Sequence, residues 1–566
     1  MNSYFQCFSI FFVFLLASNV LGDEQFPEKG VTEKSDRLLS AHAKSIPNII
    51  TERSPYLPDF SYAGYKNGNI SLPSVDGKIF NVTDYGAIAD DGKDDSESVL
   101  KAIEAAKAFD GPVVVKFPSG RFILSEILYI DRSDFAIQGV GLETTLFYPR
   151  PMRFLDTPPQ LLELSEYLIL NNKRQRERAN NIDLPFSLYA WTGGYLWARV
   201  PGARGKAYLK EYDRPPDVLA NVIEGVRGNL SVKVDDVGRL RVGDVIKLEW
   251  YNVEGRNSSL LKELYGDPTR FSIIGSHHWT NANRALVTQV TKILSMDGDQ
   301  LQLADPLLID ANRDWKPKLV RWEHLENVSL SDFTMEFPNG VYIAHHVEEG
   351  YNGIYLEGVY DGFVRNIEII NADSGILTDD IANVTLEDIT TSGPHRAHYT
   401  VHMGSVYNVL AKRVRVENTA EHPLSFNTYA VKSVYKDCEV LSYPILDQHS
   451  GANHQNLFDN IRVHLPFLDE DRTYPLFGGG GASYWKPSHG RFSTLYNIEV
   501  VTREEPHTDN VVTLKGPRDG VQSRLIGIHG TSPLKIQYGP DAHMEQINQK
   551  PRYTSLYDLQ LKERQK

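Results

Sequence analysis

Histidines gather in one part of this 566-residue chain. The segment between residues 395 and 454 contains His395, His398, His402, His422, His449 and His454. A neutral imidazole can take up a proton near pH 7, and an imidazolium or the guanidinium of Arg396 can pair with a carboxylate. This pattern favours proton-transfer chemistry on an acidic substrate.

β-Elimination from a uronic acid sugar needs a cation against the carboxylate, a base for the adjacent proton and an acid for the leaving oxygen. The candidate catalytic residues for these roles are His402, His449, Arg396 and His398. The candidate substrate-binding residues are Glu357, Asp379, Asn427, Tyr399, Asp447, His454 and Trp485. Strand alternation, with Ile354, Ile376, Val401 and Leu424 pointing inward, predicts one outer polar stripe. The stripe comprises Glu357, Asp379, His402, Asn427 and His449.

Hydrolysis by paired carboxylates is the rival chemistry, with Asp379 or Asp380 acting together with Asp447. Adjacent residues on a strand point to opposite faces, so Asp379 and Asp380 could form a working pair only at a bend. The same geometry argues against a transition-metal site at His277-His278 or His345-His346, and neither pair has a supporting ligand spacing.

The elements that must position these residues are short β-strands. One apolar position recurs at Ile367, Ile389, Val414, Cys438 and Ile461, in steps of 22, 25, 24 and 23 residues. No convincing helix lies within these steps, and one such coil cannot bury its own apolar face. The repeat therefore predicts a parallel β-solenoid, whose outer face suits a linear polymer.

A second pattern precedes the coils. It comprises Asp-Tyr-Gly-Ala at 84–87, Gly-Lys-Asp-Asp at 92–95, an amphipathic helix from Ser96 to Phe109, and Val-Val-Val-Lys-Phe-Pro-Ser-Gly-Arg-Phe at 113–122. This stretch resembles the amino-terminal end of the secreted proteins of the pectate lyase superfamily. The resemblance implies an all-β fold, a single-stranded right-handed parallel β-helix with an amino-terminal capping helix and an inserted β-rich region.

The resemblance leaves the reaction open, because the superfamily contains lyases, hydrolases, epimerases and tailspike-like proteins. Asp379-Asp380 resembles the polygalacturonase Asp-Asp, but residues 393–405 lack that family's Gly-His-Gly and residues 424–428 lack its Arg-Ile-Lys. Several superfamily lyases bridge uronate carboxylates with Ca²⁺. Calcium is an optional cofactor here, with Asp373, Asp379 and Glu357 as its candidate ligands.

Composition narrows the partners. The net charge is -14 and no basic cluster is interleaved with aromatics, so we expect an acidic polysaccharide or oligosaccharide as partner, and no nucleic acid. Residues 1–22 read as a signal peptide and no later apolar run approaches the length of a membrane span, so we expect a secreted or periplasmic protein. Cys7 lies within the signal peptide, so Cys438 has no disulfide partner in the mature chain.

We expect five segments: a signal peptide (1–22), an extended arm (23–78), a cap with the first coils (79–150), an irregular insertion (151–320), and the remaining coils with a terminal loop (321–566). The first functional hypothesis is a polysaccharide lyase or oligosaccharide dehydratase. The alternatives are a glycoside hydrolase on the same scaffold and a glycan-binding solenoid without catalysis.

Overall fold

The computed structural model describes residues 47–51, 57–166, 168, 186–203, 215–255, 258–267, 282–481, 486–503 and 510–566. The expected signal peptide lies outside the described residues, and so do His277, His278 and Trp485.

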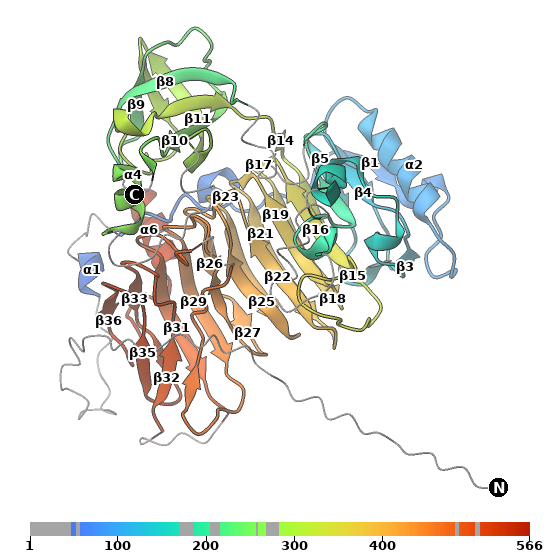
Figure 1. Cartoon of the computed structure of the whole chain (residues 1–566). Coiled ribbons are helices and arrows are strands. Elements are labelled where there is room, and N and C mark those ends of the chain that lie inside the picture. Colours follow the sequence, from blue (N-terminus) through green and yellow to red (C-terminus); the bar gives the residue numbers. More distant parts are fainter. Residues whose placement is uncertain are drawn as a thin grey trace. The chain divides into compact units, whose positions relative to one another are not determined.

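Parallel sheets run along the coils (Figure 1). The long sheet contains β1 (Lys78–Asn81), β2 (Val113–Lys116), β5 (Phe135–Gln138), β15 (Ser329–Glu336), β18 (Phe363–Ile370), β21 (Thr385–Ser392), β24 (Leu410–Val416), β26 (Val434–Lys436), β29 (Leu457–His464), β31 (Thr494–Val501), β33 (Arg524–Ile526) and β36 (His543–Glu545), with β3 (Gly120–Ile123), β6 (Thr144–Phe147), β27 (Glu439–Val440) and β34 (His529–Gly530) beside them. The site sheet contains β4 (Leu128–Ile130), β7 (Leu196–Ala198), β16 (Asn352–Glu357), β19 (Ser374–Asp379), β22 (Ala397–Met403), β25 (Ala420–Phe426) and β28 (Leu446–Gln448). The short sheet contains β14 (Leu325–Glu326), β17 (Val359–Tyr360), β20 (Ile381–Ala382) and β23 (Val406–Tyr407), and a fourth sheet contains β30 (Thr473–Tyr474), β32 (Val512–Lys515) and β35 (Leu534–Gln537). The predicted parallel β-helix is confirmed.

The apolar ladder lies in the long sheet. Ile367 pairs with Ile389 and Ile389 with Val414, and the flanking pairs extend this register to Cys438 and Ile461. All five side chains are buried in one hydrophobic core. Burial raises the pKa of Cys438 to about 12, so this thiol is a core residue rather than a nucleophile.

A bend precedes each ladder position, because the residue before it has a left-handed backbone. These residues are Asn366, Asp388, Arg413, Asp437 and Asn460, with φ between 54° and 56°. Asn and Asp tolerate this conformation better than most residues do, which accounts for most of these residue types. The bend lets each coil turn while its apolar residue stays inside.

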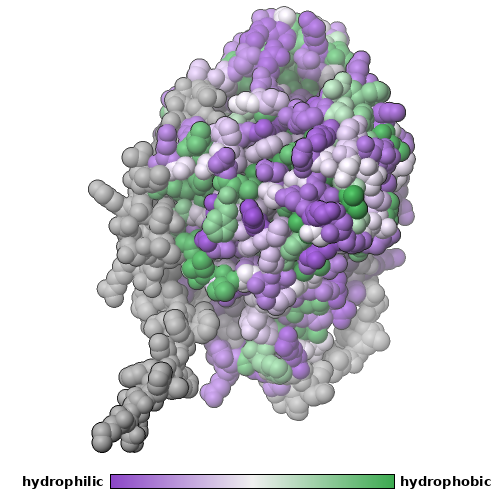
Figure 2. All heavy atoms as spheres, turned by 90° about the vertical axis from the view of Figure 1, so that its right-hand side faces the viewer, coloured by the Kyte–Doolittle hydropathy of each residue, from purple (hydrophilic) through white to green (hydrophobic). Residues whose placement is uncertain are grey.

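Helix α2 (Ser96–Lys107) covers the amino-terminal end of the solenoid, beside β1 and β2 (Figure 1). Its buried face consists of Val99, Ala102, Ile103 and Ala106. Seen from this end, hydrophilic side chains predominate and apolar ones form small groups between them (Figure 2). The cap therefore buries the open end of the core, which would otherwise be free to stack on another chain.

The insertion contains a closed antiparallel barrel, formed by β8 (Val218–Gly225), β9 (Ser231–Val234), β10 (Val245–Tyr251), β11 (Ala285–Asp297), β12 (Gln300–Leu303) and β13 (Lys318–Arg321). Helix α4 (Ser259–Tyr265) follows β10. The barrel core is continuous with the short sheet through Tyr360, Ala382 and Tyr407. The barrel thus covers one side of several successive coils.

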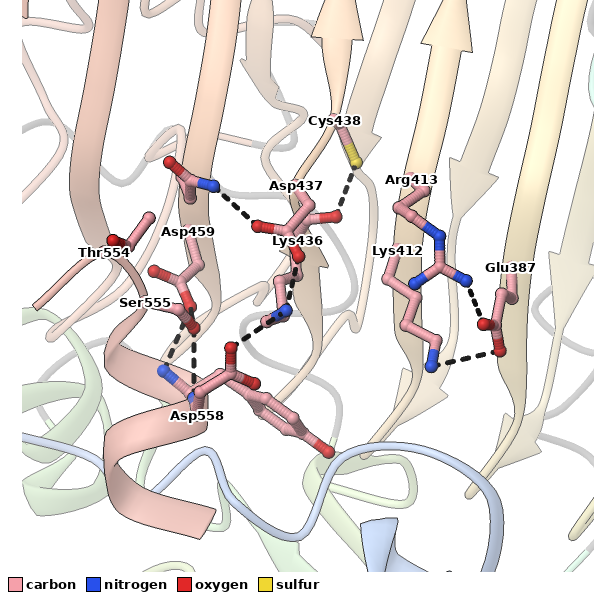
Figure 3. A network of polar contacts seen from close by, with 12 residues as sticks. Glu387, Lys412, Arg413, Lys436, Asp437, Cys438, Asp459, Thr554, Ser555 and Asp558 are labelled. Atoms are coloured by element: carbon pink, nitrogen blue, oxygen red, sulfur yellow. Dashed lines mark hydrogen bonds and ion pairs between the residues drawn. The ribbon is translucent and has the colours of Figure 1, made fainter. Parts of the chain in front are cut away.

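Helix α6 (Leu556–Arg564) lies on the outer face of the long sheet, together with residues 57–69 and the short helix α1 (Asn48–Thr51). Asp459 accepts hydrogen bonds from Ser555 Oγ (2.6 Å) and from the backbone N–H groups of Leu556 and Tyr557 (both 3.0 Å), which caps the helix (Figure 3). No helix in the described parts of the chain is long and apolar enough to cross a membrane.

Candidate functional site

The site sheet turns one face to the core. Its core-facing residues, in register from coil to coil, are Leu196, Ile354, Ile376, Val401, Leu424 and Leu446. The next residue on each strand lies on the opposite face of the sheet, which gives a file of Trp197, Tyr355, Leu377, His402, Ser425 and Asp447. The first three of these side chains are fully buried and belong to the same hydrophobic cluster as the core-facing residues. The outer face therefore changes from aromatic and aliphatic in the early coils to polar in the later ones.

A parallel file lies two residues further along each strand. Continuing the same register, it comprises Glu357, Asp379, Gly404, Asn427 and His449. The expected stripe placed His402 in this file. The structure puts His402 one file away, because Gly404 occupies the corresponding position. A Cβ on Gly404 would overlap the His402 ring, so the glycine makes room for that imidazole.

Tyr399 lies at the centre of the site. Its ring centroid is 4.1 Å from that of His398, 4.7 Å from that of His402 and 5.0 Å from that of His422. Strict alternation would put Tyr399 and His402 on opposite faces, yet their rings are in contact. The Tyr399 hydroxyl accepts a hydrogen bond from Asn427 Nδ2 (3.2 Å).

Asp447 holds two of the imidazoles. Its Oδ2 lies 2.9 Å from His449 Nδ1 and 3.2 Å from His422 Nδ1, and it accepts a hydrogen bond of 2.7 Å from Ser425 Oγ. Its Oδ1 accepts from the backbone N–H of Gly480 (3.1 Å). Burial alone would raise the pKa of Asp447, but the two imidazoles lower it well below its usual value. Asp447 is therefore an ionised group that orients His449 and His422.

Two further histidines reach the site from the segment between β15 and β16. His345 Nε2 lies 2.9 Å from His398 Nε2, and the His345 and His346 ring centroids are 3.8 Å apart. His398 Nδ1 lies 3.2 Å from Glu348 Oε1 on the same segment. The imidazole cluster, as defined here, consists of His345, His346, His398, His422 and His449. Neighbouring rings within it have centroids 3.8–5.7 Å apart.

Burial keeps several of these imidazoles unprotonated. It lowers the pKa of His346 to about 3 and lowers the pKa values of His345 and His398 well below their usual range. Repulsion from neighbouring imidazoles adds to the effect. Burial also lowers the pKa of His449, against the opposing effect of Asp447. It raises the pKa of Glu348 to about 8. Because burial disfavours their charged forms, His345, His346, His398 and His449 present nitrogen lone pairs rather than cations at pH 7.

Arg396 is not a free cation. Its Nη2 lies 2.5 Å from Glu421 Oε1, and its guanidinium lies 5.3 Å from the centre of the Tyr342 ring. Tyr342 also donates a hydrogen bond to Glu421 (3.0 Å). The expected pairing of Arg396 with a substrate carboxylate would therefore have to displace or share Glu421.

The remaining predicted residues have separate places. Glu357 and Asp379 pair in register and are nearly buried, and Glu357 accepts a hydrogen bond from Trp197 Nε1 (3.1 Å). Asp373 accepts from His395 Nε2 and from two backbone N–H groups, so its carboxylate serves the fold and is not open to calcium. His454 does not join the imidazole cluster, because it is buried near Arg227 and Gln455 toward the barrel.

Asp379 and Asp380, the adjacent carboxylates considered for hydrolysis, make separate contacts. Asp380 has a left-handed backbone (φ 56°), and its carboxylate contacts Lys247 Nζ (2.5 Å) and the indole N–H of Trp322 (2.8 Å). Lys247 belongs to β10 of the barrel, so Asp380 joins the barrel to the coils. Asp379 remains in the outer file of the site sheet.

Sequence reasoning missed His345, His346, His422 and Glu348 as site residues. His345-His346 was set aside because adjacent side chains diverge, but His345 finds its partner in His398, on a later coil. Only a register that joined residues 345, 398 and 422 could have revealed this.

Comparison with known proteins agrees with this architecture. Residues 79–148 match the family model described as rhamnogalacturonase A/epimerase, pectate lyase-like. No match to this chain was found among curated protein sequences.

Solved structures with a similar course of the chain include tailspike gp61 of Pseudomonas phage phi297, with 12% identity and a TM-score of 0.40 over 83% of this chain and 76% of that one. Another is an exopolygalacturonase of Thermotoga maritima, with 10% identity and a TM-score of 0.38 over 87% and 96%. The A-module of Azotobacter vinelandii mannuronan C-5 epimerase AlgE6 has 11% identity and a TM-score of 0.33 over 84% and 96%. Residues 79–148 thus match a pectate lyase-like family model, and the coils of this chain form a parallel β-helix, as the sequence predicted.

Proposed function

We propose that this protein is an enzyme that cleaves a uronic-acid-containing glycan by β-elimination. The observation that carries the proposal is the position of Tyr399, whose ring lies 4.7 Å from that of His402 and 6.3 Å from that of His449 on the outer face of the site sheet. A phenol flanked by imidazoles supplies both a proton donor and proton acceptors close to one another.

The reaction assigns one role to each group. His402 or His449 removes the proton from the carbon next to the carboxylate, and the electrons of that C–H bond form the new carbon–carbon double bond. The glycosidic C–O bond breaks on the other side of this double bond, and Tyr399 gives its hydroxyl proton to the leaving oxygen. The products are a sugar with a free hydroxyl and an unsaturated uronate.

Asn427 is placed to assist. Its amide donates to the Tyr399 hydroxyl, and it lies in the same file as His449. An amide N–H that can bond either the phenol or a carboxylate oxygen stabilises negative charge as it develops, without carrying a formal charge.

The outer files suit a linear polymer. Glu357 and Asp379 continue the face toward the early coils, and strands of successive coils stand about 4.8 Å apart. Both carboxylates are nearly buried, so a polymer that lay along these coils with one linkage at Tyr399 would have to displace the segments that cover them.

Hydrolysis has weaker support. A paired-carboxylate mechanism needs two carboxyl groups that face one glycosidic bond. Asp380 contacts Lys247 and Trp322, and Asp447 is occupied by Ser425, Gly480 and the imidazoles.

The test is a screen of uronic acid polymers and neutral glycans with two readouts, the ultraviolet absorbance of an unsaturated uronate and the release of reducing ends. Elimination predicts that both rise together on at least one uronic acid polymer. Reducing ends without that absorbance would establish hydrolysis instead, and binding without either signal would establish a non-catalytic solenoid.

A further inference from the structure

We propose that His345, His398 and His422 hold a divalent transition-metal ion. One imidazole nitrogen from each of the three lies within 4.8 Å of the other two. The three residues lie in three separate segments of the chain, and the fold brings them together.

The spacing of the nitrogens fits a shared ion. His345 Nε2 and His398 Nε2 are 2.9 Å apart. Zn–N bonds of about 2.0–2.1 Å place neighbouring ligand nitrogens about 2.9–3.4 Å apart, depending on the coordination geometry. His422 Nε2 is buried and has no hydrogen-bond partner among the described residues.

Carboxylates stand behind two of the three imidazoles. Glu348 Oε1 lies 3.2 Å from His398 Nδ1, and Asp447 Oδ2 lies 3.2 Å from His422 Nδ1. Both are ion-pair distances, and neither Nδ1 forms a hydrogen bond within the described residues, so a small rotation of each ring would complete the contact. Metal-bound histidines commonly present their second nitrogen to a carboxylate, which fixes the ring and leaves Nε2 for the ion. A bound dication would also favour the ionised form of Glu348.

The donor set indicates the class of ion. Imidazole nitrogens suit zinc, copper, iron and nickel, whereas calcium and magnesium prefer oxygen ligands. Three histidine ligands leave a coordination position open for water or substrate, as in catalytic zinc sites. His346 and His449 border the same space and are not needed as ligands.

The site goes beyond the proposed elimination and does not depend on it, because metal binding is measured without substrate. If the proposed elimination also holds, the ion would place a positive charge beside Tyr399, where Arg396 is already paired with Glu421.

The experiment strips the full chain with a chelator, reloads it with Zn²⁺, and measures zinc per chain and affinity by competition with a chromophoric chelator. The variants are His345→Ala, His422→Ala and Glu348→Gln. The matched control is His464→Ala, since His464 forms a similar imidazole–carboxylate pair with Glu439 (2.9 Å) outside the cluster. Loading with Co²⁺ adds a visible spectrum that reports nitrogen ligation directly.

We expect about one zinc per wild-type chain, loss of that zinc in both alanine variants, and no change in the control. Glu348→Gln keeps the shape of the side chain and should weaken binding by about 10- to 100-fold, so it tests the site even if an alanine variant fails to fold. Wild-type protein that takes up no zinc would overturn the proposal, as would folded His345→Ala and Glu348→Gln variants that bind it like wild type.

Discussion

Replacing Tyr399 with Phe should separate catalysis from folding. The change removes one oxygen and keeps the ring that stacks on His398 and His422. If the hydroxyl protonates the leaving oxygen, its loss should lower kcat/KM by about 10²–10⁴-fold, which corresponds to about 2.7–5.4 kcal/mol of barrier.

The folding cost is smaller. The Tyr399 hydroxyl accepts a hydrogen bond from Asn427 Nδ2, and a buried amide that loses one acceptor costs about 1–3 kcal/mol. The assay is the initial rate of ultraviolet absorbance on the active polymer, with urea unfolding measured alongside it. Tyr399→Phe should therefore lose far more activity than stability.

Tyr557→Phe is the matched control, because the Tyr557 hydroxyl donates to the Ala63 carbonyl (2.8 Å) beneath α6. It should lose a similar amount of stability and keep its rate. A Tyr399→Phe enzyme that is folded and retains kcat/KM within about threefold of wild type would refute the role of Tyr399, because a positioned proton donor contributes far more than that.

Three further predictions concern the same chain. His402→Ala or His449→Ala should lower turnover by about 10²–10⁴-fold while His464→Ala does not, and near-wild-type rates in both site variants would exclude them as acid or base. Gly480→Ala should lower kcat without unfolding the chain, since a Cβ there would overlap His449 Nδ1; an unchanged rate with an unchanged melting temperature would show that the ring position does not matter. Burial raises the pKa of Asp459 to about 7, so the folded state keeps a proton that the unfolded state releases from about pH 4 upward. The free energy of unfolding should thus fall by up to ~4 kcal/mol between about pH 4 and pH 7. When this free energy is measured by urea unfolding across the range, it should depend less steeply on pH in Asp459→Asn than in wild type.

The coils could be predicted from sequence because each ladder residue faces the same environment as its neighbour one coil away. Ile367, Ile389 and Val414 therefore repeat a branched apolar residue at a nearly constant spacing along the chain. The capping helix was also accessible, since α2 has an apolar stripe and lies within a recognisable pattern; its observed end, Lys107, is two residues before the expected one.

The site was only partly accessible. Alternation predicted one face for His402, Asn427 and His449, and all three lie around Tyr399 in the structure, but alternation could not predict the ring contact between Tyr399 and His402. His345 was hidden because its contacts are made across coils, from a segment without a repeat. The ion pair of Arg396 with Glu421 was hidden for a related reason, since Glu421 lies on the next coil.

The barrel has a consequence for how the chain folds. The polypeptide leaves the site sheet after Ala198 and rejoins the coils at Leu325, in β14 of the short sheet, so the coil that contains the barrel closes a very long loop. Yet the barrel begins and ends on neighbouring antiparallel strands, and Arg321 N–H donates to the Asp217 carbonyl (2.9 Å).

Once the barrel has formed, its two ends stand side by side, and only the short segments outside it remain to be closed. Shortening the effective loop from about 126 to about 23 residues reduces the entropic cost of closure by ~1.5 kcal/mol. Three of the six pairings in the barrel join strands that are consecutive in sequence, whereas β7 must find β16 across the whole insertion. We therefore expect the barrel to assemble first. By holding its two ends side by side, it would bring the coils before and after the insertion into register.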